Sequence, residues 1–251
     1  MQIEYPFNID GRGRVAEATG DEHIRQMIEQ AIPTGHDAVS AQYFQEDITD
    51  GAGEEFIVCS FPKLNMNAKP ATSSPPLLLI LKRETNSGVA TVLASTTLTT
   101  AALMHTPCSK SGNAFVDIDH DKIKELVLDT GSGTATADQY GIFRFNSDMK
   151  TLSLLKLKSQ TGKIGDAMIP AGATAEHALA FSLEDIDADG KLELIERTGT
   201  LAPAATVDDL ENSNRWNWQI EAFSWNGAML VFDRNLSEEY VEKNTSNSVQ
   251  P

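Results

Sequence analysis

The sequence predicts an all-β fold of three repeated antiparallel units, with a short helix near the N-terminus. The main observation is a repeat: DIDHDKIKELVLDTG at 117–131 returns as DIDADGKLELIERTG at 185–199, with eight of fifteen positions identical. A fainter copy, DITDGAGEEFIVCSF, lies 70 residues before the first of these, at 47–61. Repetition at a fixed long period indicates supersecondary units that stack on one another. Each copy places an acidic loop before an apolar strand.

The helix is expected between residues 21 and 31. Thr19 and Glu22 have the spacing of a capping box, in which Thr19 accepts from the Glu22 amide and Glu22 returns the bond. One apolar face with helical spacing follows, made of Ile24, Met27, Ile28 and Ala31. We predict that Ile24, Met27 and Ile28 are buried and that the helix ends near Pro33.

Each repeat is predicted to form four short strands, one before the acidic loop, one after it, and a hairpin. The three hairpins span 77–84 and 89–95, 140–145 and 151–157, and 218–223 and 228–232. Asn226-Gly227 predicts a type I′ turn in the last one, because both residues accept a positive φ. Four strands in about 70 residues are typical of a blade of a β-propeller. Three blades are fewer than the four that usually close a ring, so an open stack, a disguised fourth blade or an oligomer is expected.

This pattern divides the chain into three parts. An N-terminal segment with the helix covers 1–36, a β-repeat domain covers 37–238, and a polar stretch without periodicity, 239–251, is expected to be a flexible tail. The acidic loops of the β-repeat domain lie at 47–55, 117–125 and 185–193.

Composition excludes several classes of function. The net charge of −16 and the pI near 4.6 argue against binding to nucleic acid or to an anionic membrane surface, since both need a basic surface. No apolar run approaches the ~20 residues of a membrane span. The first ten residues, MQIEYPFNID, lack the basic and apolar regions of a secretory signal. The location stays open: extracellular or periplasmic if a signal was removed, and otherwise cytoplasmic or particle-associated.

Cys59 and Cys108 leave the redox environment open as well. Cys59 ends the strand after the first acidic loop, and Cys108 precedes the strand that leads into the second. A disulfide between them would suit an oxidising compartment, whereas two buried thiols would suit the cytoplasm.

The third acidic loop has the composition of a calcium site. Calcium takes six to eight hard oxygen ligands, and alternating carboxylates around a tight turn converge on one point. Gly190 permits the left-handed backbone at the bend. The expected ligands are the side chains of Asp185, Asp187, Asp189 and Glu193 with the carbonyl of Lys191. The alternative is a solvated acidic turn.

The other two loops are weaker versions of the same pattern. The second keeps four carboxylates, those of Asp117, Asp119, Asp121 and Glu125. It has Lys122 where the third loop has glycine, and lysine opposes both the positive φ and the bound cation. In the first loop Asp47 and Glu55 remain, but Thr49 and Gly51 replace two carboxylates, so we expect it to be metal-free.

The pattern Asp-x-Asp-x-Asp-Gly-x-x-Glu-Leu before an apolar strand resembles the FG-GAP or VCBS repeat of β-propeller proteins. The resemblance covers about residues 41–235 and is clearest in the third repeat. It implies calcium in the acidic loops and a role in adhesion, ligand binding or structure. The implied partner is a protein or a glycan.

A second resemblance covers residues 5–32. Tyr5-Pro6-Phe7, Asp10, Gly13-Arg14 and the helix at 21–30 are similar to the start of the baseplate-wedge family of contractile phage tails and related injection systems. This resemblance implies docking to baseplate or tail proteins, and it ends after Gly35. The alternative function is therefore a structural component or cargo of a contractile injection particle.

An enzyme is the third hypothesis. LVLDTGSG at 126–133 matches the aspartic protease pattern, with Asp129 as the catalytic carboxylate. That chemistry needs two aspartates sharing a proton, and the chain has no second Asp-Thr-Gly. Because Thr130-Gly131 aligns with Thr198-Gly199, we interpret the pair as a turn common to the repeats. We therefore expect a non-enzymatic protein.

Three tryptophans lie close together in the sequence in and beside the last predicted hairpin, at positions 216, 218 and 225. They could form a platform for a carbohydrate or peptide. Alternating aromatic residues in a hairpin are more often half-buried packing, which is the interpretation we favour.

Overall fold

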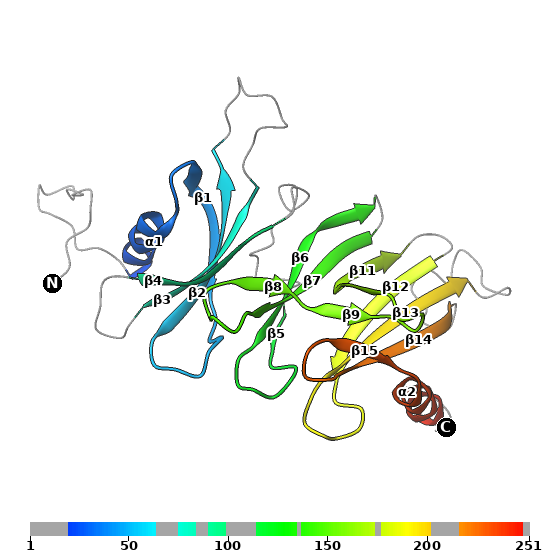
Figure 1. The fold of residues 1–251 in the computed structure, drawn as a ribbon. Coiled ribbons are helices and arrows are strands. Elements are labelled where there is room, and N and C mark those ends of the chain that lie inside the picture. The colour runs from blue at the N-terminus through cyan, green and yellow to red at the C-terminus, as the bar shows by residue number, and fades with distance from the viewer. Residues whose placement is uncertain are drawn as a thin grey trace, which may run out of the picture. The chain divides into compact units, whose positions relative to one another are not determined.

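The computed structural model describes residues 20–63, 75–83, 90–98, 114–134, 137–173, 177–201 and 216–247. These residues form mostly antiparallel β-structure, with α1 (Gly20–Ala31) near the start and α2 (Arg234–Asn247) near the end, as Figure 1 shows. The all-β class with a short N-terminal helix is therefore confirmed.

The chain divides into two compact units, where a single β-repeat domain over 37–238 was expected. Unit 1 comprises Met1–Lys110 and Phe145–Leu152, and unit 2 comprises Ser111–Arg144 and Ser153–Pro251. Unit 1 carries the first acidic loop, and unit 2 carries the second and third. The division follows backbone pairing, because the strands of the second and third repeats share one sheet.

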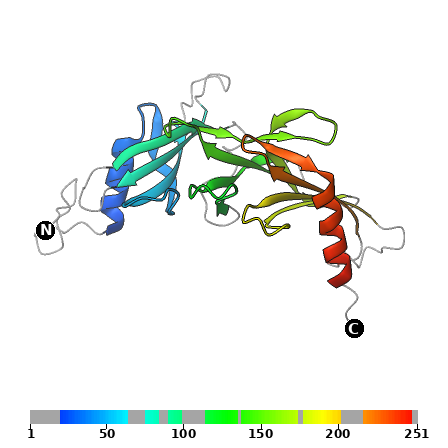
Figure 2. The same ribbon diagram turned by 60° about the horizontal axis from the view of Figure 1, so that its bottom comes forward.

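Unit 1 is a helix on a four-stranded antiparallel sheet with the order β1-β2-β3-β4 (Figure 2). The strands are β1 (His36–Gln45), β2 (Glu54–Pro62), β3 (Leu77–Arg83) and β4 (Ala90–Thr97). Its main core cluster combines the apolar stripe of the helix with alternate residues of two central strands: Met27, Ile28, Phe56, Val58, Leu79 and Leu81.

The predicted N-terminal helix is confirmed, and it packs on its own sheet. Met27 and Ile28 are 3% and 2% exposed, and Ile24 packs against the edge of the same cluster. Thr19 of the predicted capping box lies outside the described residues. In β2, Cys59 is buried and disulfide-bonded, while Cys108 also lies outside the described residues.

Unit 2 contains an eleven-stranded sheet. Its main path has the order β10-β9-β15-β14-β13-β12-β11-β7-β6-β5, with β8 paired to β7. The first strands are β5 (Ala114–Val116), β6 (Glu125–Thr134), β7 (Ala137–Phe145), β8 (Leu152–Leu154), β9 (Lys156–Lys158) and β10 (Ile164–Asp166). The remaining strands are β11 (Met168–Ala173), β12 (His177–Glu184), β13 (Glu193–Leu201), β14 (Trp216–Trp225) and β15 (Leu230–Asp233).

The second and third repeats are joined through the extra strand β11. It pairs antiparallel with β7 on one side and with β12 on the other. Residues of both repeats, among them Val127, Ile142, Leu194 and Phe223, form one hydrophobic cluster. One pair departs from the antiparallel pattern, because β9 runs parallel to β15.

The expected flexible tail from 239 is instead the second half of α2. Asp233 Oδ1 caps the helix by accepting from the Asn235 amide at 2.9 Å and the Leu236 amide at 3.2 Å. Leu236 and Tyr240, one turn apart, are buried against the cluster that includes Ile195. Because only two residues of α2 belong to this cluster, its apolar residues do not repeat at a helical spacing that would identify the helix from sequence.

Two predicted turns have a different structure. Thr198-Gly199 lies inside strand β13, where a Cβ on Gly199 would come within 2.9 Å of the Trp218 ring. The glycine is therefore needed for close packing within the sheet. Thr130 likewise lies in β6, and its hydroxyl donates to the Gln139 carbonyl at 2.8 Å.

The Asn226-Gly227 hairpin exists, but its turn is not type I′. Trp225 pairs with Leu230, so the loop has four residues. Gly227 has a φ of 93°, whereas Asn226 is absent from the residues with positive φ. The Asn226 side chain instead accepts from the amides of Ala228 and Met229, both at 3.0 Å, and so closes the turn.

Two glutamates face each other across strands β13 and β14. Glu196 pairs in register with Glu221, and its other cross-strand neighbour is Phe181. Burial, and then the nearby charge of Glu221, raise the pKa of Glu196 to about 7. The carboxyl group of Glu196 therefore changes between its neutral and charged forms near neutral pH.

Glu196→Gln should reduce the pH dependence of stability. Folding raises the pKa of Glu196 from 4.5 to about 7, so the folded protein holds this proton more tightly than the unfolded chain. The resulting contribution to stability is complete below pH 4.5 and is lost as the pH rises through 7. We expect the wild-type protein to lose about 1–2 kcal/mol of unfolding free energy over that window relative to the variant. Urea unfolding at several pH values measures this. Glu238→Gln on α2 is the control, and equal slopes for wild type and Glu196→Gln would contradict the assignment.

Candidate metal centre

Each acidic loop ends in a buried glutamate that holds the loop closed. One oxygen of the glutamate accepts from the backbone amide of the second loop residue, an isoleucine whose side chain is also buried. The N···O distances are 2.8, 2.9 and 2.8 Å for Ile48–Glu55, Ile118–Glu125 and Ile186–Glu193, respectively. The three repeats therefore share one local structure at this point.

The second and third loops also share their backbone conformation. His120 and Lys122 have φ values of 63° and 73°, and the residues 68 positions later, Ala188 and Gly190, have 61° and 87°. The expectation that Lys122 would resist the glycine conformation is not met. The lysine adopts it, at a cost of about 1 kcal/mol for a residue with a Cβ.

The third loop brings three of its predicted ligands together. One carboxylate oxygen each of Asp185, Asp187 and Glu193 lie within 4.8 Å of one another. Both aspartates are exposed, whereas Glu193 is 3% exposed. Glu193 Oε2 accepts from Ile186, and no described residue donates to Oε1. A cation among these oxygens would therefore contact a carboxylate of which one oxygen accepts no hydrogen bond from the described residues.

The other two predicted ligands of the third loop are arranged differently. Asp189 is not part of the convergent group. Its carboxylate accepts from the Lys191 amide at 2.8 Å and pairs with Lys191 Nζ at 3.0 Å, both at exposed positions. Recruiting Asp189 to a cation would require this ion pair to open. Nothing in the described contacts places the Lys191 carbonyl beside the three carboxylates.

The second loop forms an equivalent group from Asp117, Asp119 and Glu125. Asp121 is directed elsewhere, since it accepts from the Ile123 amide at 2.8 Å and pairs with Arg144 at 3.3 Å. Asp119 Oδ1 is buried and has no hydrogen-bond partner among the described residues. An unpartnered buried carboxylate oxygen is costly unless a positive ligand reaches it.

The first loop holds a side-chain ammonium in place of a ligand group. Lys82 Nζ lies 3.2 Å from Glu55 Oε1 and 3.4 Å from Thr49 Oγ1. The Thr49 hydroxyl also donates to Glu55. The first loop is not among the groups of described acidic side chains that could hold a metal ion.

Burial determines the electrostatics of the two metal-like groups. It raises the pKa of Glu125 to about 7, against the lowering effects of the Ile118 amide and Arg144. Burial also raises the pKa of Glu193 and of Asp119, and neighbouring aspartates add to each shift. A bound cation would reverse these shifts, because it stabilises the charged carboxylates.

The donor set fits a hard divalent cation. All the converging atoms are carboxylate oxygens, which calcium and magnesium prefer over softer metals. Three carboxylates provide fewer than the six to eight oxygens that calcium takes, so water and backbone carbonyls would complete the shell. A cation held by these oxygens would stabilise the loop.

The second and third loops touch each other. His120 Nδ1 lies 2.8 Å from the Gly190 carbonyl, and the Leu192 amide donates to the Ile118 carbonyl at 3.0 Å. A Cβ on Gly190 would come within 3.0 Å of His120 Nδ1. The two candidate sites are therefore in direct contact, and the exposed side chain of His120 provides one of the contacts.

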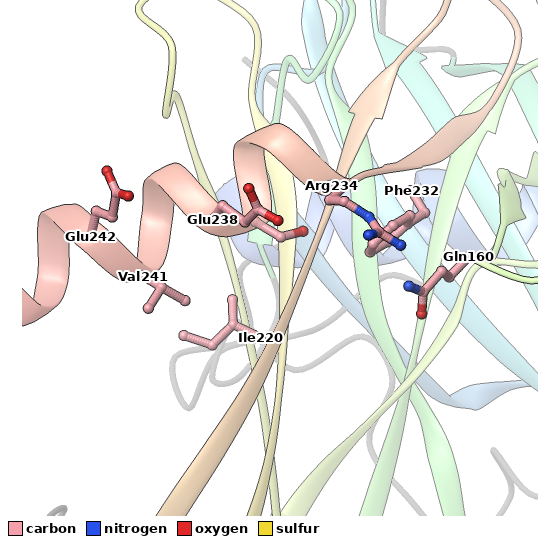
Figure 3. Close-up of a pocket in the computed structure, with 8 residues that line it drawn as sticks. Gln160, Ile220, Phe232, Arg234, Glu238, Val241 and Glu242 are labelled. Carbon is pink, nitrogen blue, oxygen red and sulfur yellow. The ribbon is translucent and has the colours of Figure 1, made fainter.

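Unit 2 has a shallow groove of about 510 Å³ beside α2 (Figure 3). Ile220, Phe232 and Val241 supply its apolar wall, and Arg234, Glu238 and Glu242 supply charged groups. Its one serine, Ser237, is a structural group: the hydroxyl accepts from the Ala222 amide and donates to the Asp233 carbonyl. The Ser237 hydroxyl therefore ties α2 to β14.

The aromatic residues of β14 are partly packed and partly open. Trp216 and Trp218 have ring centroids 6.3 Å apart at a tilt of 51°, and Trp218 is 37% exposed. Trp225 stacks under the Arg144 guanidinium at 4.8 Å. The candidate protease residue Asp129 lies in β6 opposite Tyr140.

No known family model, curated protein or solved structure matches this chain. The two family resemblances therefore remain predictions. Among the described residues, neither helix is long and apolar enough to span a membrane.

Exchanging the residues at the bend tests the equivalence of the two loops. Lys122→Gly should stabilise the protein by about 1 kcal/mol, because glycine adopts a positive φ without strain. Gly190→Ala should destabilise it by at least as much, since the new Cβ also approaches His120. Urea unfolding in excess chelator measures both changes without a contribution from metal. A Lys122→Gly variant that is less stable than wild type would contradict the shared backbone.

Proposed function

We propose that this protein is a non-enzymatic, calcium-stabilised β-repeat module that binds a protein or glycan partner. The observation that carries the proposal is the convergence of Asp185, Asp187 and Glu193 on one point within 4.8 Å. The third loop supplies these oxygens from a backbone that the second loop repeats 68 residues earlier.

The location of the donors explains why a cation would stabilise the fold. Glu193 begins β13 at the centre of unit 2, and its side chain fastens the loop to the strand through the Ile186 amide. A cation bound to Glu193 and the two aspartates would connect the start of the loop to its end. Calcium would therefore order the loop at the point where β12 passes into β13.

The binding role is supported by two surfaces of unit 2. The groove beside α2 combines apolar and charged groups, which is the composition of a polar ligand or peptide site. The partly exposed Trp218, packed beside Trp216, offers an aromatic face of the kind that stacks on sugar rings. Neither surface carries a paired nucleophile and base among the described residues.

The alternative, a component or cargo of a contractile injection particle, depends on residues 5–32. Residues 20–32 are described, and the apolar face of α1 packs into the core of unit 1. That face is therefore occupied within the chain, and no described residue specifically favours docking to a tail.

Calcium should raise the thermal stability of the protein, and Asp187→Ala should remove most of the increase. Binding to the folded state alone stabilises it by about 2.7 kcal/mol at a hundredfold excess over the dissociation constant. Melting curves in calcium and in chelator measure the effect. Asp166→Ala, in an exposed strand, is the control and should keep the calcium response. Equal melting temperatures in calcium and chelator would contradict the proposal.

Trp218→Ala tests the partner class. If the partner is a glycan that stacks on β14, the intact chain should bind members of a glycan array in calcium, and this variant should lose binding. The variant should keep the calcium-dependent melting shift, because Trp218 lies far along β14 from the Glu193 end of β13. Absence of any glycan binding by the intact chain would direct the search to protein partners, captured by crosslinking.

A further inference from the structure

The residue opposite the buried glutamate differs among the three repeats. In the first, Glu55 pairs in register with Lys82. In the second, Leu126 pairs with Phe143, so Arg144 is the cross-strand neighbour of Glu125. In the third, Leu194 pairs with Phe223, which places Ser224 beside Glu193. One equivalent position thus carries a lysine, an arginine and a serine.

In the first loop, the lysine at this position fills the loop interior. Its ammonium contacts Glu55 Oε1 and Thr49 Oγ1, and a Cβ on Gly51 would come within 2.9 Å of Nζ. The side chains of Lys82 and Glu55 are 17% and 1% exposed. The positive charge therefore lies inside the loop, close to the buried carboxylate.

In the second loop, the arginine covers the carboxylates only in part. Its guanidinium lies 3.1 Å from Asp119 Oδ2, 3.3 Å from Asp121 Oδ2 and 3.8 Å from Glu125 Oε1. The guanidinium also lies over the ring of Trp225, 4.8 Å from its centroid. Asp119, with a side chain 10% exposed, still has an unpartnered oxygen, so a single guanidinium does not satisfy the group.

In the third loop no cation lies opposite the glutamate, and Lys191, within the loop, acts on Asp187 and Glu193 only through its charge at longer range. Among the described residues, no lysine or arginine pairs with Asp185, Asp187 or Glu193. Lys191 pairs with Asp189, and Lys243 bonds the Ile186 carbonyl and pairs with Glu239. Glu193 is 3% exposed and has one oxygen that accepts no hydrogen bond from the described residues. A cation bound beside this oxygen would stabilise the charged form of the Glu193 carboxylate.

We propose that a lysine or arginine opposite the buried glutamate acts as a tethered cation and replaces a bound metal ion. Lys82 makes the first loop metal-independent, Arg144 partly compensates the second, and Ser224 leaves the third dependent on an external divalent cation. This inference rests on the proposed calcium function, and it goes further by naming the strand residue that decides whether a loop with three converging carboxylates takes the ion. The deciding residue lies outside the acidic loop itself.

The test exchanges the tethered charge between loops in the intact chain. Ser224→Lys should abolish the rise in melting temperature caused by calcium and should raise the melting temperature in chelator. Arg144→Ser should do the reverse: lower stability in chelator, and a second calcium ion per chain by isothermal titration calorimetry. Lys82→Ser is the matched control, since Thr49 and Gly51 replace two of the carboxylates in that loop. It should lower stability in chelator without adding a site.

The outcomes separate this inference from the proposed function. Calcium that still stabilises Ser224→Lys as strongly as wild type would overturn the inference, as would weaker calcium binding by Arg144→Ser. If the wild-type chain binds no calcium, the proposed function fails. The tethered-charge effect is then tested by the chelator melts alone. In those melts, Ser224→Lys must be more stable than wild type and the two serine variants less stable; any other order also overturns it.

Discussion

The buried glutamate at the end of each acidic loop is the interaction on which the structure depends. Its carboxylate accepts a hydrogen bond from the backbone amide of the loop isoleucine, whose side chain is buried in the core. The same burial removes water from the carboxylate, which makes its charge expensive. All three loops provide the amide donor, and the first two also place a cationic side chain opposite the glutamate.

These contacts connect the strands to the loops. The positive groups of the first two loops come from β3 and β7, strands that pair with the one on which the glutamate lies. Arg144, the positive group of the second loop, also packs on Trp225 of β14, which belongs to the third repeat. The two loops of unit 2 also meet through His120 and Gly190. In unit 2, the charge near Glu125 thus depends on the pairing of β6 with β7, on the packing of Arg144 against Trp225 and on the contact between the two loops.

The repeat in the sequence was sufficient to predict the acidic loops and their shared local structure. The spacing from isoleucine to glutamate is seven residues in all three loops. Positive φ angles occur at residues 120 and 122 and recur 68 positions later, at 188 and 190. The N-terminal helix was also predictable, because its apolar face has four members. By contrast, α2 has too few apolar positions for a periodic signal, and its Asp233 cap is recognisable only once the helix is known.

The sequence by itself determined where carboxylates gather, since their spacing is local. It also determined the fold class, since strand patterning and turns are local as well. Only the tertiary structure decided which carboxylates converge and what opposes them. Lys82 lies 27 residues from Glu55, and Gly199 requires the Trp218 ring to explain it. These relations are set by strand register and packing, which bring together residues whose separation along the chain carries no periodic signal.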